Sequence, residues 1–450
     1  MKVLSKIQTG EFREVFMGLQ LLATADLHLG RISSGVSGLG EKSSTRHTWY
    51  NMVEWALEHK MDAFVIAGDI VEHDNRYFEA LSALEKGLAR LGDAGIRVIM
   101  VAGNHDYDVL PQIVRQQGFE HVQLLGQKGQ WTVEKVDLNG TAIQFTGWSF
   151  TSQHHSADPV AEFPDADLDP NLMTIGVIHG EYEVRQSSYA PLSFHTLSGA
   201  GADAWVMGHI HKPEVFHTSP LIFYPGSPHA MSAKEPGAHG PFLLSIDENG
   251  RIDHKQIPVS PVRYEPLELE LTGAETKEEF RSQLHLALEE AIKTDIDESE
   301  YLKMVVFDVD LTGYHQNLKE VDSWIEESDY QNLQREVSGL KVIIRRTENR
   351  CKMKVGNLEV LANEASPAGM LALAILDLEK QQESGFLNSL KEKMGSAIAD
   401  LNVHSTYIPL RDSDEIDQLE AKDEVIDEIL LKECNRLLSE MMLTKEGRDG

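Results

Sequence analysis

Aspartate, asparagine and histidine residues stand at the ends of five short apolar runs in this chain. In each run the apolar side chains stop abruptly, and residues that can ligate metal ions or transfer protons follow within a few positions. One such run would be weak evidence, but the repetition of the pattern predicts a chemical site. The eight residues are Asp26, His28, Asp69, Asn104, His105, His179, His209 and His211.

Parallel strands would bring these residues together. The apolar runs predict strands over residues 20–25, 63–67, 97–102, 174–178 and 204–207. Helical spacing over residues 47–60 and 77–92 separates the first three strands, which indicates βαβ units and a parallel sheet. The carboxyl ends of parallel strands meet at one edge of a sheet, where sites in open α/β sheets gather. The sequence therefore predicts an α/β fold with one site at that edge.

The residue types indicate a pair of metal ions. Imidazole and carboxylate ligands suit Mn, Fe or Zn better than Ca or Mg. Seven candidate ligands are too many for one tetrahedral ion, but they suit two ions roughly 3.5–4 Å apart that share a carboxylate. Taken singly, each motif has an ordinary explanation: His179 could be a core histidine, and Gly103-Asn104-His105-Asp106 could be a turn. Their joint occurrence favours two-metal phosphoester hydrolysis.

Five motifs together resemble the signature of the calcineurin-like metallophosphoesterases: Asp26-Leu27-His28, Gly68-Asp69, Gly103-Asn104-His105-Asp106, His179 and Gly208-His209-Ile210-His211. The resemblance covers roughly residues 18–260 and implies a four-layer αββα sandwich, in which two β-sheets pack between helices. Two hairpins, predicted to turn at Asn139-Gly140 and Asn249-Gly250, agree with a second sheet.

The resemblance also implies a role for each residue. One metal ion takes Asp26, His28 and His211. The other takes Asn104, His179 and His209, and Asp69 bridges the two. His105 would face the substrate as the catalytic residue, where it either protonates the leaving oxygen or stabilises the transition state. Asp106 is expected to support the site from behind these residues.

Within the superfamily the chain is most similar to SbcD and YhaO-like DNA repair exonucleases. The similarity rests on Asp26-Leu27-His28-Leu29-Gly30 and on the stretch from Gly208 to Pro213, with Tyr224-Pro225-Gly226-Ser227-Pro228 after it. It implies a manganese-dependent DNA exonuclease and endonuclease in double-strand break repair, with DNA and an SbcC-like SMC-type ATPase as partners. One departure is Glu72, which stands where these nucleases usually have histidine. Glu72 would either orient His105 or be a solvated loop carboxylate.

Prolines at 258, 261 and 266 mark a predicted boundary between two domains. Residues 18–265 would form the metallophosphoesterase domain, and residues 266–450 an acidic α+β C-terminal extension that caps DNA and binds the partner. The extension holds one basic cluster, in which Arg345, Arg346 and Arg350 are candidate DNA contacts. The alternative is a solvated strand face that balances nearby acids.

Composition narrows the classes of function. The net charge is −31, divided as −12 over residues 1–265 and −19 over residues 266–450. This balance gives no support to broad electrostatic binding of nucleic acid, so DNA binding must rest on a local patch or on a partner. No apolar stretch approaches the roughly 20 residues that span a bilayer, and the chain carries no secretory signal pattern. With only two cysteines, Cys351 and Cys434, a cytoplasmic location without membrane contact is expected.

Three hypotheses remain open from the sequence. The first is the manganese-dependent DNA nuclease, and the second is a phosphodiesterase or phosphatase that acts on a small molecule or nucleotide. The third is a subunit that mainly binds and regulates an ATPase, which the intact ligand set of Asp26, His28, Asp69, Asn104 and the three later histidines disfavours. The sequence leaves open whether the chain is a homodimer.

Overall fold

The computed structural model describes residues 18–34, 36, 43–71, 78–164, 167–271, 273–294, 296, 299–325, 335–337, 339–354, 357–403 and 422–449. The chain divides into two compact units. The first unit comprises Met1–Glu265, Asp297–Val306 and Arg335–Ile343, and the second comprises Pro266–Ile296, Phe307–Gln334 and Ile344–Gly450. The candidate metal ligands all lie in the first unit.

A six-stranded sheet of order β14-β13-β1-β2-β3-β4 carries the first three strand ends. Its strands are β1 (Leu19–Thr24), β2 (Ala63–Ala67), β3 (Arg97–Val101), β4 (Val122–Leu124), β13 (Phe242–Ile246) and β14 (Ile252–Gln256). Strands β1 to β4 pair in parallel, while β13 is antiparallel to β1 and to β14. The central strands are apolar on both faces because both faces are covered.

A second six-stranded sheet, of order β11-β12-β10-β7-β6-β5, carries the other two strand ends. Its strands are β5 (Thr132–Leu138), β6 (Thr141–Trp148), β7 (Thr174–His179), β10 (Ala204–Gly208), β11 (Glu214–Thr218) and β12 (Leu221–Tyr224). Strands β6, β7, β10 and β12 are parallel, and β5 and β11 close the two edges as antiparallel strands.

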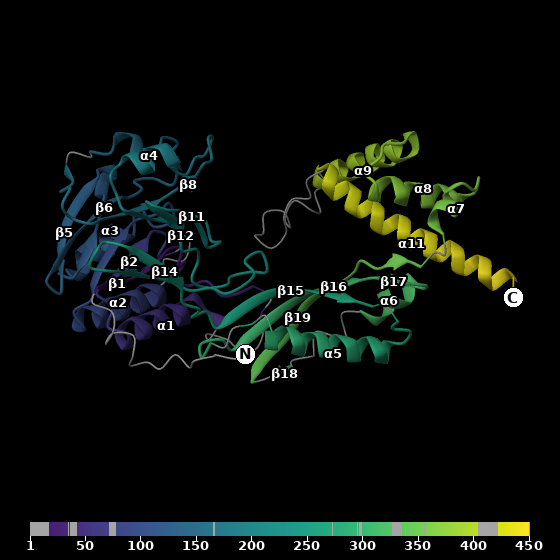
Figure 1. The fold of residues 1–450 in the computed structure, drawn as a ribbon, viewed down its shortest axis with the longest axis horizontal. Coiled ribbons are helices and arrows are strands. Elements are labelled where there is room, and N and C mark those ends of the chain that lie inside the picture. The colour runs from purple at the N-terminus through teal and green to yellow at the C-terminus, as the bar shows by residue number, and fades with distance from the viewer. Residues whose placement is uncertain are drawn as a thin grey trace. The chain divides into compact units, whose positions relative to one another are not determined.

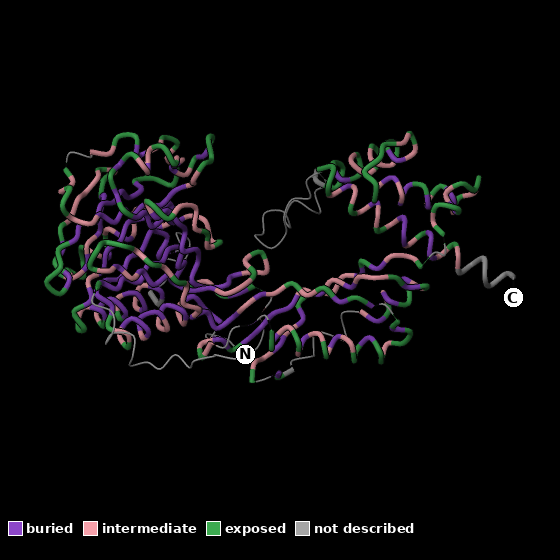
Figure 2. Tube along the Cα trace, viewed as in Figure 1, coloured by how far each residue is buried: buried purple, intermediate pink, exposed green. Residues whose placement is uncertain are grey.

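The two sheets pack face to face and share one apolar core. Side chains alternate between the two faces of each strand, so Leu21 and Val65 point to the second sheet and meet Phe145 and Val177 there. The strands β1, β2, β7 and β10 are buried throughout (Figure 2). This sheet-on-sheet core fixes how the two sets of strand ends face one another.

Helices cover the outer face of each sheet. Helices α1 (Thr45–Glu58), α2 (Phe78–Asp93) and α3 (Leu110–Gln117) pack on the first sheet, where Trp49 and Leu84 contact the core around Phe64. The short helix α4 (Phe194–Gly199) covers the second sheet through Leu197, which packs near Trp205. Figure 1 shows α1 and α2 on one side of this unit and α4 on the other. The four-layer αββα sandwich expected from the sequence is confirmed.

Both hairpins turn where the sequence predicts. Strands β5 and β6 pair from Thr132 opposite Gly147 to Leu138 opposite Thr141, around Asn139-Gly140, whose φ angles are 54° and 89°. Positive φ at both central residues matches the twist of a two-residue hairpin, and asparagine followed by glycine adopts it at little cost. Strands β13 and β14 pair across a longer loop, residues 247–251, in which Gly250 has a φ of 78° and the Asp247 N–H donates to Arg251 O at 3.0 Å. This second hairpin belongs to the first sheet, so the expectation that both hairpins support the second sheet is wrong for β13 and β14. These hairpins place antiparallel edges on sheets whose inner strands are parallel.

The later part of the chain mixes strands and helices. Its strands are β15 (Val262–Glu270), β16 (Met304–Thr312), β17 (Tyr314–His315), β18 (Arg335–Val337), β19 (Leu340–Asn349) and β20 (Lys352–Met353). Its helices are α5 (Lys277–Thr294), α6 (Leu318–Trp324), α7 (Leu358–Ala362), α8 (Pro367–Glu379), α9 (Gly385–Val403) and α11 (Asp423–Asp449). Four of these strands form a sheet of order β15-β16-β19-β18. Pro258 and Pro261 precede β15, whereas Pro266 lies within it, so the expected boundary between residues 265 and 266 falls inside a strand.

Within the described residues, no helix combines the length and the hydropathy that crossing a membrane requires.

Candidate metal centre

Five strands deliver the predicted residues to one region of the first unit. Asp26 follows β1, Asp69 follows β2 and Asn104 follows β3, at the carboxyl edge of the first sheet. His179 ends β7 and His209 follows β10, at the carboxyl edge of the second. Because β7 and β10 pair in parallel with Gly208 opposite His179, these two ends coincide. Side chains from both sheets therefore converge on a site between the two edges.

The backbone at these strand ends is unusual. Asp26, His28, Asp69 and His209 all have positive φ angles, of 51°, 43°, 51° and 103°. Residues other than glycine rarely adopt a positive φ, because it costs about 1–3 kcal/mol per residue. They keep it only where the surrounding structure enforces it. Here the chains after β1 and β2 enforce it, because the Asp26 and His28 N–H groups donate to Gly68 O (3.1 Å) and Asp69 O (3.0 Å). Backbone hydrogen bonds of the fold thus hold these residues in a conformation that turns their side chains toward one another.

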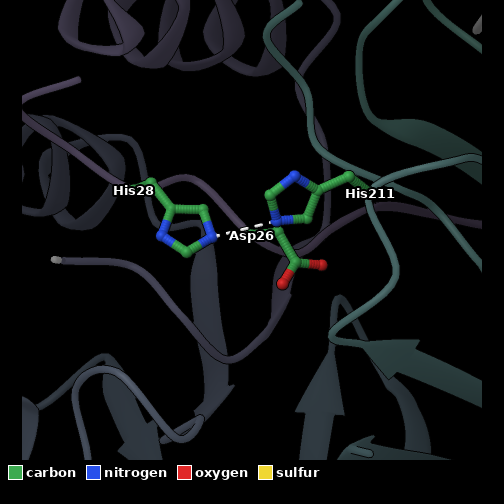
Figure 3. Close-up of side chains that lie close together, drawn as sticks. All are labelled: Asp26, His28 and His211. Atoms are coloured by element: carbon green, nitrogen blue, oxygen red, sulfur yellow. Dashed lines mark hydrogen bonds between the residues drawn. The ribbon is translucent and has the colours of Figure 1, made fainter. Parts of the chain in front are cut away.

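One group of candidate ligands consists of Asp26, His28 and His211 (Figure 3). One ligand atom from each lies within 4.8 Å of the other two, and the Nε2 atoms of His28 and His211 are 3.2 Å apart. The Nδ1 atom of His211 is 2.7 Å from Glu235 Oε1, so it carries the proton and leaves a lone pair on Nε2. Both carboxylate oxygens of Asp26 accept the His209 backbone N–H at 3.1 Å. Asp26 is thereby fixed with its charge beside two imidazole nitrogens.

The second group consists of Asp69, His179 and His209. His179 Nδ1 donates to Ala67 O at 2.9 Å, so its Nε2 atom faces Asp69 Oδ2, 3.3 Å away. Asn104 joins this group through Oδ1, which lies 2.9 Å from His179 Nε2 and 3.2 Å from His209 Nδ1. A carboxylate oxygen, an amide oxygen and imidazole nitrogens therefore face a common point. Such electron-rich atoms repel one another unless a proton or a cation lies between them.

His105 and Asp106 occupy different places at the end of β3. The His105 backbone N–H donates to Asp69 Oδ1 at 2.9 Å, and its partly exposed ring meets His28 edge to face at 5.2 Å. Asp106 is fully buried and accepts the backbone N–H groups of Ile70 and Gly103, both at 2.7 Å. Asp106 therefore ties the loops after β2 and β3 together, whereas His105 borders both groups from the solvent side.

Burial and neighbouring charges perturb the titration of these groups strongly. Burial raises the pKa of Asp26. Burial alone would raise the pKa of Asp69, but the nearby His179 outweighs it and the pKa falls below its usual value. Burial opposes a charge on His179, yet Asp69 raises the pKa of His179 to about 9. Burial lowers the pKa of His209 to about 3. Two buried carboxylates that gather positive charge on a histidine form a site that attracts cations.

Glycines allow the backbone to lie very close to two of the candidate ligands. A Cβ atom at Gly208 would lie 1.9 Å from Ala67 O and 2.6 Å from His179 Nδ1, and one at Gly103 would lie 2.1 Å from Asp69 Oδ1. Real Cβ atoms do not approach so closely, so any other residue would push His179 or Asp69 out of place. The glycines that precede the histidine and asparagine motifs thus serve the close approach of backbone to ligand groups.

The donor set fits divalent metal ions. Each group offers a carboxylate and two imidazole nitrogens, and in each group a hydrogen bond behind one ring, that of His211 or His179, orients that ring. Mixed nitrogen and oxygen donors are the ligands that Mn, Fe and Zn take. The described residues therefore contain two adjoining candidate sites for a metal ion, as the sequence indicates.

Sequence reasoning missed two carboxylates behind the histidines. Glu235 contacts His211, and Glu181 Oε1 lies 3.3 Å from His209 Nε2. Glu181 follows His179 by two positions and carries a weak signal, but nothing in the spacing marks Glu235. Glu72, expected near His105, lies outside the described residues.

The arginines expected to contact DNA are paired with acids. In the second unit Arg345 forms an ion pair with Asp308. Arg346 and Arg350 lie 3.2 and 3.4 Å from the carboxylate of Glu348. These ion pairs balance much of the local positive charge. They therefore favour the alternative interpretation of the cluster, a solvated strand face whose arginines balance nearby acids. Contact with DNA stays a prediction.

Comparison with known proteins finds one matching family model and several similar proteins. Residues 19–213 match the family model described as calcineurin-like phosphoesterase. The uncharacterized metallophosphoesterase YhaO of Bacillus subtilis (strain 168) is 28% identical over 283 residues, which cover 57% of this chain and 64% of the relative. The DNA double-strand break repair protein Mre11 of Methanopyrus kandleri is 27% identical over 290 residues, covering 58% and 62%. In both relatives the matched part is less than two thirds of their length.

A third relative is matched along nearly its whole length. The SbcD component of the nuclease SbcCD from Staphylococcus saprophyticus is 22% identical over 381 residues, which cover 76% of this chain and 99% of the relative. The matched region therefore extends beyond the first unit into the later part of this chain.

Proposed function

Because residues 19–213 form a calcineurin-like metallophosphoesterase domain, we propose that this protein is a two-metal phosphodiesterase that cleaves DNA. The observation that carries the proposal is the pair of adjoining groups, Asp26, His28, His211 and Asp69, His179, His209, at the carboxyl edges of two packed sheets. The relatives favour DNA among phosphodiesters, because one is described as a DNA repair protein and another as part of a nuclease.

In this proposal each group would hold one divalent ion, Asn104 would complete the second set, and Asp69 would serve both. Two such ions activate a water and neutralise charge on a phosphoryl group when they are bound. His105 is proposed as the catalytic residue. Its partly exposed ring meets His28 edge to face, and from there it would give a proton to the leaving oxygen. Asp106 keeps the His105 loop in register with the loop after β2.

The finer assignment is a manganese-dependent exonuclease with endonuclease activity, which acts in the cytoplasm in double-strand break repair. Mn²⁺ suits the mixed nitrogen and oxygen donors. An SbcC-like SMC-type ATPase is the proposed partner, which would supply much of the grip on DNA. This division of labour fits a net charge of −31, because so acidic a chain repels the DNA backbone. Residues 266–450 are proposed to cap DNA and to bind that partner.

A panel of substrates tests the proposal. The full chain is stripped with a chelator, reloaded with Mn²⁺ or Mg²⁺, and given end-labelled linear duplex DNA, circular single-stranded DNA, bis-p-nitrophenyl phosphate and p-nitrophenyl phosphate. We expect Mn²⁺-dependent release of nucleotides from duplex ends, slower cleavage of the circle, and faster hydrolysis of the diester than of the monoester. The chelated protein serves as the control.

Hydrolysis of only the p-nitrophenyl esters would overturn the nuclease assignment and leave a small-molecule phosphodiesterase or phosphatase. No hydrolysis by protein that binds Mn²⁺ would favour a regulatory subunit instead.

A further inference from the structure

A glutamate that no motif marks lies directly behind one candidate ligand. Glu235 is in the segment between β12 and β13, and only 14% of its side chain is exposed. Its Oε1 atom lies 2.7 Å from His211 Nδ1, the ring nitrogen that faces away from Asp26 and His28. The distance is that of a charge-assisted hydrogen bond, which is stronger than a neutral one.

Hydrogen bonds to its carboxylate and to its backbone fix the position of Glu235. Its other oxygen, Oε2, accepts the Met231 backbone N–H at 3.0 Å. Its own N–H donates to Ser232 O at 3.0 Å, and its carbonyl oxygen lies 3.0 Å from His239 Nε2. The other nitrogen of that buried histidine, Nδ1, lies 2.7 Å from Ser227 O. Because both carboxylate oxygens and both backbone groups are bonded, Glu235 cannot swing to another position without breaking several contacts.

Such a carboxylate acts on a metal ion through the ring it contacts. A fixed acceptor at Nδ1 keeps the proton there, aims the Nε2 lone pair and makes the imidazole a more basic ligand. The two groups differ in this respect. His179 donates to a neutral carbonyl, and the Glu181 oxygen behind His209 is 3.3 Å away. The shortest carboxylate contact thus belongs to the group of Asp26, His28 and His211.

We propose that Glu235 is a positioning residue that orients His211 and sets the affinity of the Asp26, His28 and His211 group for its metal ion. The inference rests on the proposed function, since it requires that this group binds a metal. We therefore expect the affinities for the two ions to depend to different degrees on the residues behind the histidine ligands. Glu235 acts on one ion and leaves the other unchanged.

Binding of Mn²⁺ alone tests this inference. Free Mn²⁺ is counted by electron paramagnetic resonance while metal is added to the chelated full chain. The variants are Glu235→Ala, which removes the carboxylate, and Glu235→Gln, which keeps its size and one acceptor oxygen. Glu214→Gln is the matched control, because Glu214 is an exposed glutamate on β11 three residues after His211.

We expect Glu235→Ala to weaken one of two Mn²⁺ sites by about 10–100-fold, as loss of a partner behind a metal-bound histidine typically does. Glu235→Gln should weaken the same site less, and Glu214→Gln should bind as the unmodified chain does. Hydrolysis by Glu235→Ala should recover at high Mn²⁺ concentration, with an unchanged circular dichroism spectrum.

Each other result has its own meaning. Two unaltered sites in both Glu235 variants would overturn the inference while the proposed function stands. Equal weakening of both sites, with activity that metal does not restore, would also overturn it, because that is the result of general loosening. Failure of the unmodified chain to bind two Mn²⁺ ions would instead contradict the proposed function.

Discussion

Replacing Asp69 by asparagine is expected to abolish hydrolysis and to weaken the binding of both metal ions. Asp69 is the carboxylate proposed to be shared, with Oδ2 at 3.3 Å from His179 Nε2 and Oδ1 accepting the His105 N–H at 2.9 Å. Asparagine has the same shape and keeps an acceptor for His105, but it lacks the negative charge. The rate of DNA hydrolysis should fall by more than the roughly 10²–10⁴-fold that one acid–base group contributes. The reason is that loss of metal binding also removes the proposed action of His105, which requires bound metal.

The measurement pairs Mn²⁺ counting with DNA hydrolysis on the same protein samples. Asp253→Asn serves as the matched control, because Asp253 is an exposed aspartate on β14, away from both groups of candidate ligands. That control should bind two ions and cleave DNA normally. An Asp69→Asn protein that still binds two Mn²⁺ ions with unchanged affinity would show that Asp69 is not shared between them.

Replacing His105 by alanine is expected to slow DNA cleavage by roughly 10²–10⁴-fold while Mn²⁺ binding stays intact. His105 is in neither group of candidate ligands, yet its ring contacts His28 and its backbone contacts Asp69. It therefore borders the site without closing it. Loss of the ring removes a proton donor for the leaving oxygen and leaves the carboxylates and the other histidines in place.

The leaving group decides which role His105 has. The sugar oxygen of DNA is a poor leaving group that needs a proton, whereas p-nitrophenolate leaves without one. If His105 is a proton donor, His105→Ala should slow hydrolysis of bis-p-nitrophenyl phosphate far less than cleavage of DNA. Equal losses of rate on the two substrates would show instead that His105 stabilises charge in the transition state. His195→Ala, at an exposed histidine on α4, is the control. Full activity of His105→Ala on every substrate would remove His105 from the mechanism.

The strand ends could be predicted from sequence because local patterns report them directly. Apolar runs such as Ala63–Ala67 are buried on both faces, and the polar residue that follows marks the point where burial stops. The Asn139-Gly140 turn is equally local, since the positive φ angles it needs depend on those two residues. Position at the edge of a parallel sheet then brings distant residues together without further information.

The contacts that depend on loops and on strand pairing could not be predicted. Glu235 follows His211 by 24 positions, in a segment with no regular spacing, so only the folded path of that segment brings it to the ring. Arg345 likewise meets Asp308 from a neighbouring strand, 37 positions away. From the sequence the arginine belongs to a basic cluster, but pairing of β16 with β19 sets an acid against it. The left-handed backbone at Asp26 and His28 also had no signal, because neither residue type requires it.

The proposed pair of metal ions is tested most directly by crystals of the full chain grown with Mn²⁺, measured for anomalous scattering at the manganese absorption edge. We expect two peaks, one among Asp26, His28 and His211 and one among Asn104, His179 and His209, with the Asp69 carboxylate between them. A single peak, or manganese bound away from these residues, would contradict this expectation.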